Sequence, residues 1–259
     1  MLRLYVKYLS VRFRSVMEYK SSFFLTFFTQ FILTFTAFLS IDFVMNRFGA
    51  VGGFSYAEVL ICYAVSYFSF AFAECFFRGF DTFGTMLSNG EFDRIMVRPR
   101  NTVFQVIATR IEFTKLGRML GALIVLAYAI AESTIDWTLG KAGVLVLMFV
   151  GGVTFFTGLF IAGAALCFFT IQRVEFINIF TDGVRELGRY PLSIYGKEIL
   201  LFFTLVMPFA CVQYYPFLYL SERSDNLLTA LSPLATFVFL IPCYVFWRIG
   251  QRHYRSTGS

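Results

Sequence analysis

The side chains that most often carry out catalysis are scarce in this chain of 259 residues. The only histidine, His253, lies in the polar tail, so a Ser-His-Asp arrangement or a histidine-based metal site lacks a ligand near a buried pocket. Five cysteines are scattered singly without a C-x-x-C pair, which favours small apolar packing residues over zinc or redox ligands; they are Cys62, Cys75, Cys167, Cys211 and Cys243. We therefore predict no catalytic residue, no metal and no cofactor bound by this chain.

Nucleotide binding also lacks a recognisable sequence. No G-x-x-x-x-G-K-[ST] phosphate loop is present. The nearest glycine cluster, Gly151 to Leu166, contains no lysine, and its small residues are expected to let helices approach closely. If the protein uses ATP, another subunit must bind it.

The composition is that of a membrane protein. Apolar residues make up 58% of the chain, charged residues 15%, and the mean hydropathy is +0.70, whereas a soluble domain has about 25% charged residues. Several apolar runs reach the roughly 20 residues that cross a hydrocarbon core of about 30 Å. We predict an all-α polytopic fold with six transmembrane helices. The approximate spans are residues 23–44, 57–77, 116–131, 142–171, 192–212 and 233–249.

The flanks of these spans carry further expectations. The short third span gains length if Lys115 and Arg118 extend towards the headgroups. Residues 1–20 alternate apolar and basic residues at helical spacing, which predicts an amphipathic helix in the membrane interface. A secretory signal is the rival interpretation, but no A-x-A-like cleavage site closes the apolar run.

Lysine and arginine predict the orientation. Nineteen of the 22 basic residues fall in the N-terminal segment, the loops on the same side and the tail, including Arg173, Arg185, Arg189, Lys197 and Arg255. The opposite loops hold only Arg47, Lys141 and Arg223. Basic flanks stay cytoplasmic, so we expect a multi-pass protein of the cell membrane (the inner membrane of a bacterium) with both termini in the cytoplasm. Membrane topology and anionic lipid explain the net charge of +6 better than nucleic-acid binding does.

Few ionisable residues lie inside the predicted spans. Glu74 is followed one helical turn later by Arg78, and a screened pair at the interface explains both. Asp42 falls near the outer end of the first span. No chain of carboxylates crosses the membrane, which disfavours a proton- or sodium-driven transporter.

One charged segment, Leu87 to Asn101, lies between the second and third spans. Ser88 with Glu91 three residues later forms a capping-box pattern, and Pro99 ends the predicted helix because Arg98 is pushed away from helical angles. Phe92 and Met96 share an apolar face. That face must dock either on the protein's own helices or in a groove of a soluble partner, and the residues alone leave both open.

The same segment carries a resemblance. Its Gly90, Glu91, Phe92, Asp93, Arg94, Ile95, Met96, Val97, Arg98 and Pro99 resemble the G-E-x-D-x-x-x-x-R-P sequence of the six-span permease subunits of ABC-2 type ABC transporters. The resemblance implies one transmembrane domain over residues 1–259, with a coupling helix in the loop between spans two and three. Carried over to this chain, Glu91, Asp93, Arg94 and Arg98 would contact an ATP-binding subunit, Phe92 and Met96 would anchor the helix, and Pro99 would end it.

The resemblance also implies an assembly and a function. The permease would pair with two ATP-binding subunits, which hold ATP and magnesium, and with a second permease that is identical or related. It would form half of the pathway of an ATP-driven exporter and would not itself be an enzyme. The alternatives to this function are an ATPase-independent secondary transporter or channel, and a membrane scaffold that does not transport.

From the residues themselves, Tyr63, Tyr67 and Phe70 of the second span are candidate pathway residues for a hydrophobic or amphipathic substrate. Packing explains aromatic residues at this density nearly as well. Members of the ABC-2 permease family have a re-entrant hairpin between spans five and six, so the resemblance implies one in the segment after Pro208. The alternative is an ordinary outer loop with Tyr214, Tyr215 and Tyr219 in the aromatic belt.

Overall fold

A computed structural model describes residues 2–170 and 176–254, and these residues form helices and no strand. Ile171, Arg173 and Arg255, which belong to expectations above, lie outside the described residues. The α-helices are α1 Leu2–Glu18, α2 Lys20–Phe48, α3 Tyr56–Asp81, α4 Phe83–Ser88, α5 Glu91–Met96, α6 Thr102–Thr109, α7 Leu116–Glu132, α8 Leu139–Thr170, α9 Phe176–Leu187, α10 Lys197–Leu205, α11 Ala210–Leu220, α12 Leu227–Leu231 and α13 Ala235–His253. Three short 3₁₀ helices are η1 Phe113–Lys115, η2 Leu192–Tyr195 and η3 Ser232–Leu234.

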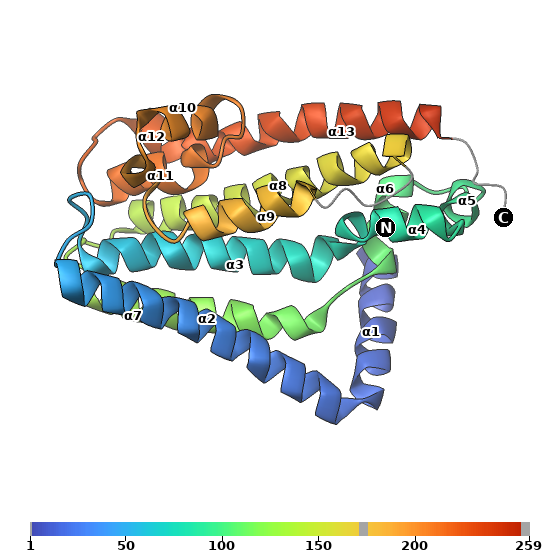
Figure 1. The fold of residues 1–259 in the computed structure, drawn as a ribbon, viewed down its shortest axis with the longest axis horizontal. Coiled ribbons are helices and arrows are strands. Elements are labelled where there is room, and N and C mark those ends of the chain that lie inside the picture. Colours follow the sequence, from blue (N-terminus) through green and yellow to red (C-terminus); the bar gives the residue numbers. More distant parts are fainter. Residues whose placement is uncertain (1, 171–175, 255–259) are drawn as a thin grey trace.

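The long helices run side by side along the long axis of the molecule (Figure 1). We call the end that holds α1, α4, α5 and α6 the basic end, and the end that holds the turn between α2 and α3 the far end. Among the described residues, five helices are long and apolar enough to cross a membrane, or six if a bent pair of helices counts as one. The prediction of an all-α polytopic membrane protein is confirmed.

The central helix of the bundle is α3. Most of its apolar window is buried, whereas α2 and α13 leave most of theirs exposed, as lipid-facing helices do. Glycines permit close approaches between helices. A Cβ on Gly117 of α7 would lie 2.1 Å from the Phe27 carbonyl oxygen of α2, and one on Gly152 of α8 would lie 2.4 Å from the Ser69 hydroxyl of α3. The prediction that small residues of the glycine cluster let helices approach closely is confirmed at Gly152.

The single helix expected over residues 192–212 is not present. The chain there forms η2, α10 and the first residues of α11, and α10 and α11 meet at an angle of 110°. Pro191 disfavours a helical Tyr190 before it, and α9 ends three residues before Tyr190, at Leu187. Pro208 has no backbone N–H to donate, and it lies in the break between α10 and α11.

The bent pair runs from Lys197 to Leu220 and so begins before Pro208, after which we expected a re-entrant hairpin. Its shape fits a broken span as well as a re-entrant hairpin, and the hairpin stays a prediction. A Cβ on Gly188 would lie 3.0 Å from the Phe209 ring, so the turn between α10 and α11 reaches the interrupted end of α9. The Gln213 amide donates to the carbonyl oxygens of Gly188 and Tyr190, at 2.9 and 3.0 Å. These bonds satisfy backbone groups that a broken helix inside a membrane leaves free.

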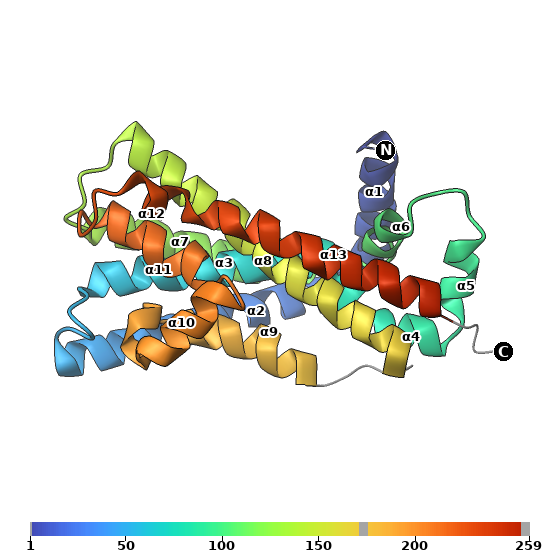
Figure 2. The ribbon, with the colours of Figure 1, turned by 90° about the horizontal axis from the view of Figure 1, so that it is seen from above.

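The basic residues of this region also differ from expectation. Arg185 lies on α9 and Arg189 just after it, and Lys197 begins α10, which lies in the half of the bundle nearer the far end (Figures 1 and 2). The predicted basic loop holding these three residues is therefore absent, because α9, η2 and α10 occupy that stretch.

The first helix, α1, crosses the long axis of the bundle at the basic end (Figure 1). Leu9, Val16 and Met17 pack on a small cluster formed by Phe23, Ile111 and Phe113, while Val6 and Val11 are exposed. An amphipathic helix held in this crosswise position fits the expected interfacial helix.

Candidate coupling and transport sites

The charged segment forms two short helices instead of one capped helix. Gly90 adopts the left-handed conformation (φ 66°) directly before α5, and glycine takes this conformation without a steric cost. The Ser88 hydroxyl donates to the Thr85 carbonyl oxygen of α4 and does not cap α5. The predicted capping box is therefore wrong, because the chain turns at Gly90 and starts the helix there.

The aromatic side chain of α5 is enclosed by its own chain. Phe92 is fully buried, and its ring lies 5.1 Å from that of Phe83, 5.4 Å from Phe168 and 5.3 Å from Tyr254 between centroids. Ile95 is also buried. Phe92 thus holds α5 on the bundle, and its ring is not on the surface that a partner could reach.

Asp93 has a partner in the same chain. The Tyr254 hydroxyl donates to Asp93 Oδ1 at 3.0 Å. Burial of the phenol, followed by its hydrogen bond to Asp93, raises the pKa of Tyr254 to about 12. Tyr254 therefore remains a neutral donor at physiological pH, and it ties α5 to the end of α13.

The remaining predicted coupling residues form an exposed face. They are Glu91, Arg94, Met96, Arg98 and Pro99, and Val97 beside them is 83% exposed. Within the described residues, neither Arg94 nor Arg98 forms an ion pair. This surface, which we call the α5 face, includes Val97. It combines one carboxylate, two guanidinium groups and three apolar side chains on α5 and the residues directly after it.

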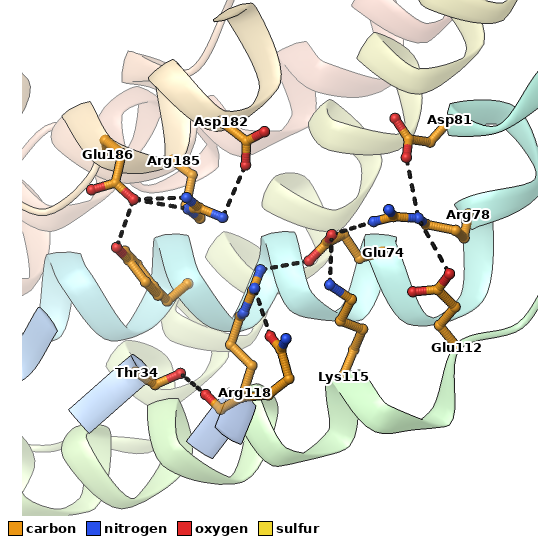
Figure 3. Close-up of polar contacts among 12 residues, drawn as sticks. Thr34, Glu74, Arg78, Asp81, Glu112, Lys115, Arg118, Asp182, Arg185 and Glu186 are labelled. Atoms are coloured by element: carbon orange, nitrogen blue, oxygen red, sulfur yellow. Dashed lines mark hydrogen bonds and ion pairs between the residues drawn. The ribbon is translucent and has the colours of Figure 1, made fainter. Parts of the chain in front are cut away.

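A buried charged cluster surrounds Glu74 of α3 (Figure 3). Glu74 is buried and forms ion pairs with Arg78, with Lys115 at 3.0 Å and with Arg118 at 2.5 Å. Arg118 also donates to Gln30 of α2 at 2.7 Å. The sequence predicted only the Arg78 pair. The expected extension of Lys115 and Arg118 towards the headgroups is wrong, because both turn inward to Glu74.

The cluster continues towards the loop that contains α5. Arg78 pairs with Asp81 at 3.1 Å and with Glu112 at 3.5 Å, and the Glu112 amide donates to the Cys75 carbonyl oxygen. Glu112 lies between α6 and η1. Charged groups therefore connect the end of the α4–α6 loop to α2, α3 and α7.

The three aromatic pathway candidates are buried in this chain. The Tyr63 hydroxyl donates to the Thr34 carbonyl oxygen at 2.6 Å. The Tyr67 hydroxyl donates to Glu186 at 3.0 Å, and the Phe70 ring lies 4.9 Å from the Arg185 guanidinium. Tyr67 and Phe70 thus contact α9, while Tyr63 contacts α2.

Charged residues of α9 lie near the middle of the bundle. We did not predict this feature from the sequence, because we had assigned Arg185 to a loop outside the membrane. Arg185 pairs with Asp182 at 3.0 Å and Glu186 at 2.8 Å (Figure 3). Its neighbours Tyr67 and Phe70 are about 16–21 Å along α3 from Tyr56, at 1.5 Å per residue. The Asp182 side chain is 53% exposed and that of Glu186 is 40% exposed. We call this surface the α9 face.

A comparison with protein families matches residues 31–258 to the ABC-2 family transporter proteins. The match covers most of the chain, and the chain belongs to this family of ABC transporter permeases. No curated protein and no solved structure gives a match. The family implies a membrane-embedded permease subunit that is not catalytic and works with an ABC ATP-binding subunit.

Proposed function

We propose that this chain is the permease of an ATP-driven exporter and couples to its ATP-binding subunit through the α5 face. The observation that carries the proposal is the division of α5 into two sides. Phe92 and Ile95 are buried in the chain, whereas Arg94, Met96 and Val97 are exposed. A partner that moves the exposed side must therefore move the bundle with it.

The charged cluster supplies a route for that movement. Arg78 and Glu112 link the loop to Glu74, and Arg118 joins Glu74 to Gln30 on α2. Buried ion pairs tolerate separation poorly because an uncompensated charge is costly. We infer that α2, α3 and α7 shift together when the partner displaces α5, and ATP biases this equilibrium by binding the two states differently.

The α9 face supports the role of this chain as half of a pathway. Carboxylates as exposed as Asp182 and Glu186 would be costly against acyl chains near the middle of a membrane. A water-filled pathway between this chain and a second permease, identical or related, removes that cost. Tyr67 contacts Glu186 and Phe70 contacts Arg185 on the buried side of α9. Because charged side chains would line the pathway at this depth, we infer that the transported molecule has a polar part.

The remaining assignments follow from the same scheme. Two ATP-binding subunits hold ATP and magnesium, and this chain holds no cofactor. The basic end faces the cytoplasm of a cell whose plasma or inner membrane the bundle spans, because basic flanks are retained there. Outward transport is the proposed direction.

Co-purification with the ATP-binding subunit tests the coupling. We would replace Arg94→Glu together with Met96→Glu on the α5 face, with Arg47→Glu, an exposed residue at the far end, as the control. The proposal predicts that the double variant keeps its thermal unfolding midpoint and loses the ATP-binding subunit, while the control keeps both. Equal recovery of the subunit with all three proteins would contradict coupling through α5, and transport without the subunit would favour a secondary transporter.

A further inference from the structure

A pocket of about 180 Å³ opens at the basic end, between α1, the segment after α5, and α6. Three arginines line it: Arg12 from α1, and Arg98 and Arg100 from the segment after α5. Tyr8 and Gln105 add polar groups. We call this site the arginine pocket.

The pocket has an uncompensated positive charge. No aspartate or glutamate lines it. Within the described part of the chain, its three arginines form no ion pair, and Arg12 donates only to the Thr109 carbonyl oxygen. Three arginines that line one pocket without a counter-charge make a site for an anion.

Buried contacts fix one wall of the pocket. The Gln105 amide is buried and donates to the carbonyl oxygens of Ile95 at 3.2 Å and Arg100 at 3.1 Å. These bonds hold the backbone of the segment that presents Arg98 and Arg100. A guanidinium offers paired N–H donors in a plane, which match the oxygens of a phosphate group. The arrangement therefore suits a phosphate better than a simple halide.

The position of α1 indicates where the phosphate comes from. If the long helices cross the membrane, α1 lies along the membrane surface (Figure 1), with Val6 and Val11 exposed for insertion among lipids. Tyr8 and Arg12 of the same helix line the pocket. We propose that the arginine pocket binds the phosphate group of an anionic membrane lipid. Basic pockets of this kind bind anionic headgroups at membrane surfaces.

Lipid binding by the purified full-length chain tests the proposal. Native mass spectrometry would compare phosphatidylglycerol with the zwitterionic phosphatidylcholine. The variant is Arg12→Gln with Arg100→Gln, and the matched control is Arg14→Gln, another exposed arginine of α1 that is outside the pocket. We expect a preference for phosphatidylglycerol that falls at least about tenfold in the double variant, in line with the loss of two charge-assisted contacts, and is retained in Arg14→Gln.

Further arms separate the alternatives. Arg100→Lys keeps the charge but loses the planar donor pair, so binding intermediate between native and double variant supports the proposal, provided that the unfolding midpoints agree. An equal loss in Arg14→Gln, or no preference between the two lipids, would overturn it in favour of diffuse surface charge. Complete displacement of the lipid by equimolar glycerol phosphate would assign the pocket to a soluble phosphate. If the Arg12→Gln, Arg100→Gln variant binds lipid unchanged but loses the ATP-binding subunit, the proposal fails and the arginine pocket binds an acidic side chain of that partner.

Discussion

Glu74 is the residue on which the charged cluster depends. Its carboxylate faces Arg78, Lys115 and Arg118, and a glutamine in its place leaves three cations in a buried site. Removing one partner of a buried ion pair costs about 3–5 kcal/mol. We therefore expect Glu74→Gln to lower the free energy of unfolding by that order, measured by thermal denaturation in detergent. Glu112→Gln, at the edge of the cluster, is the control, and equal losses would contradict a central role for Glu74.

Tyr254 gives a prediction about pH. Its pKa is raised to about 12, so the neutral phenol contributes stability that is complete below the ordinary tyrosine pKa of about 10 and is lost as the pH rises through about 12. Tyr254→Phe removes the hydrogen bond to Asp93, which is worth about 1.5–3 kcal/mol for a charged acceptor. The loss of stability should be constant between about pH 6 and pH 9, where the phenol does not titrate. A loss that varies strongly over this interval would contradict the assignment.

The contact between α2 and α7 depends on Gly117. A Cβ there would lie 2.1 Å from the Phe27 carbonyl oxygen, whereas a Cβ on Gly143 of α8 would meet no atom within 4 Å. We expect Gly117→Ala to destabilise the bundle, because two backbones must separate, by about 1–3 kcal/mol. Gly143→Ala should be neutral or stabilising by up to about 1 kcal/mol, because alanine favours a helix. Thermal unfolding of the pair measures the difference, and similar midpoints would contradict the close packing.

The sequence predicts these elements unevenly. Apolar length alone located α2, α3, α7, α8 and α13 within a few residues. The fifth span could not be predicted in the same way, because α10 and α11 are each too short to be recognised by apolar length. In addition, the Gln213 amide donates to the carbonyl oxygen of Tyr190, 23 residues earlier in the chain. When a side chain remote in sequence supplies the hydrogen bonds for a break in a helix, the local sequence carries no pattern that predicts the break.

The candidate sites show the same limit. The charges around α5 and Pro99 after it identified this segment in the sequence. The burial of Phe92, however, depends on ring contacts with Phe168 and Tyr254, which are remote in sequence. Lys115 and Arg118 were visible as charges, and only the packing of α7 on α3 aims them at Glu74. Tertiary contacts therefore decide which side of each element is buried and which is exposed.

The whole molecule presents two surfaces that the proposed cycle must connect: the α5 face at the basic end and the α9 face near mid-membrane. Ile179 lies on α9, one turn before Asp182, and is 67% exposed, while Ile241 of α13 is 62% exposed. If the α9 face lines a water-filled pathway, a membrane-impermeant charged thiol reagent should modify Ile179→Cys and spare Ile241→Cys. The five native cysteines are buried, which keeps the background low.

The measurement that tests coupling most directly is the rate of this modification at Ile179→Cys in the complex with the ATP-binding subunit, with and without a non-hydrolysable ATP analogue. We predict that the analogue changes the rate severalfold, and that Arg94→Glu with Met96→Glu abolishes the change while Ile241→Cys stays unreactive throughout. A rate at Ile179→Cys that ignores the nucleotide in an intact complex would contradict ATP-driven movement of the pathway through α5.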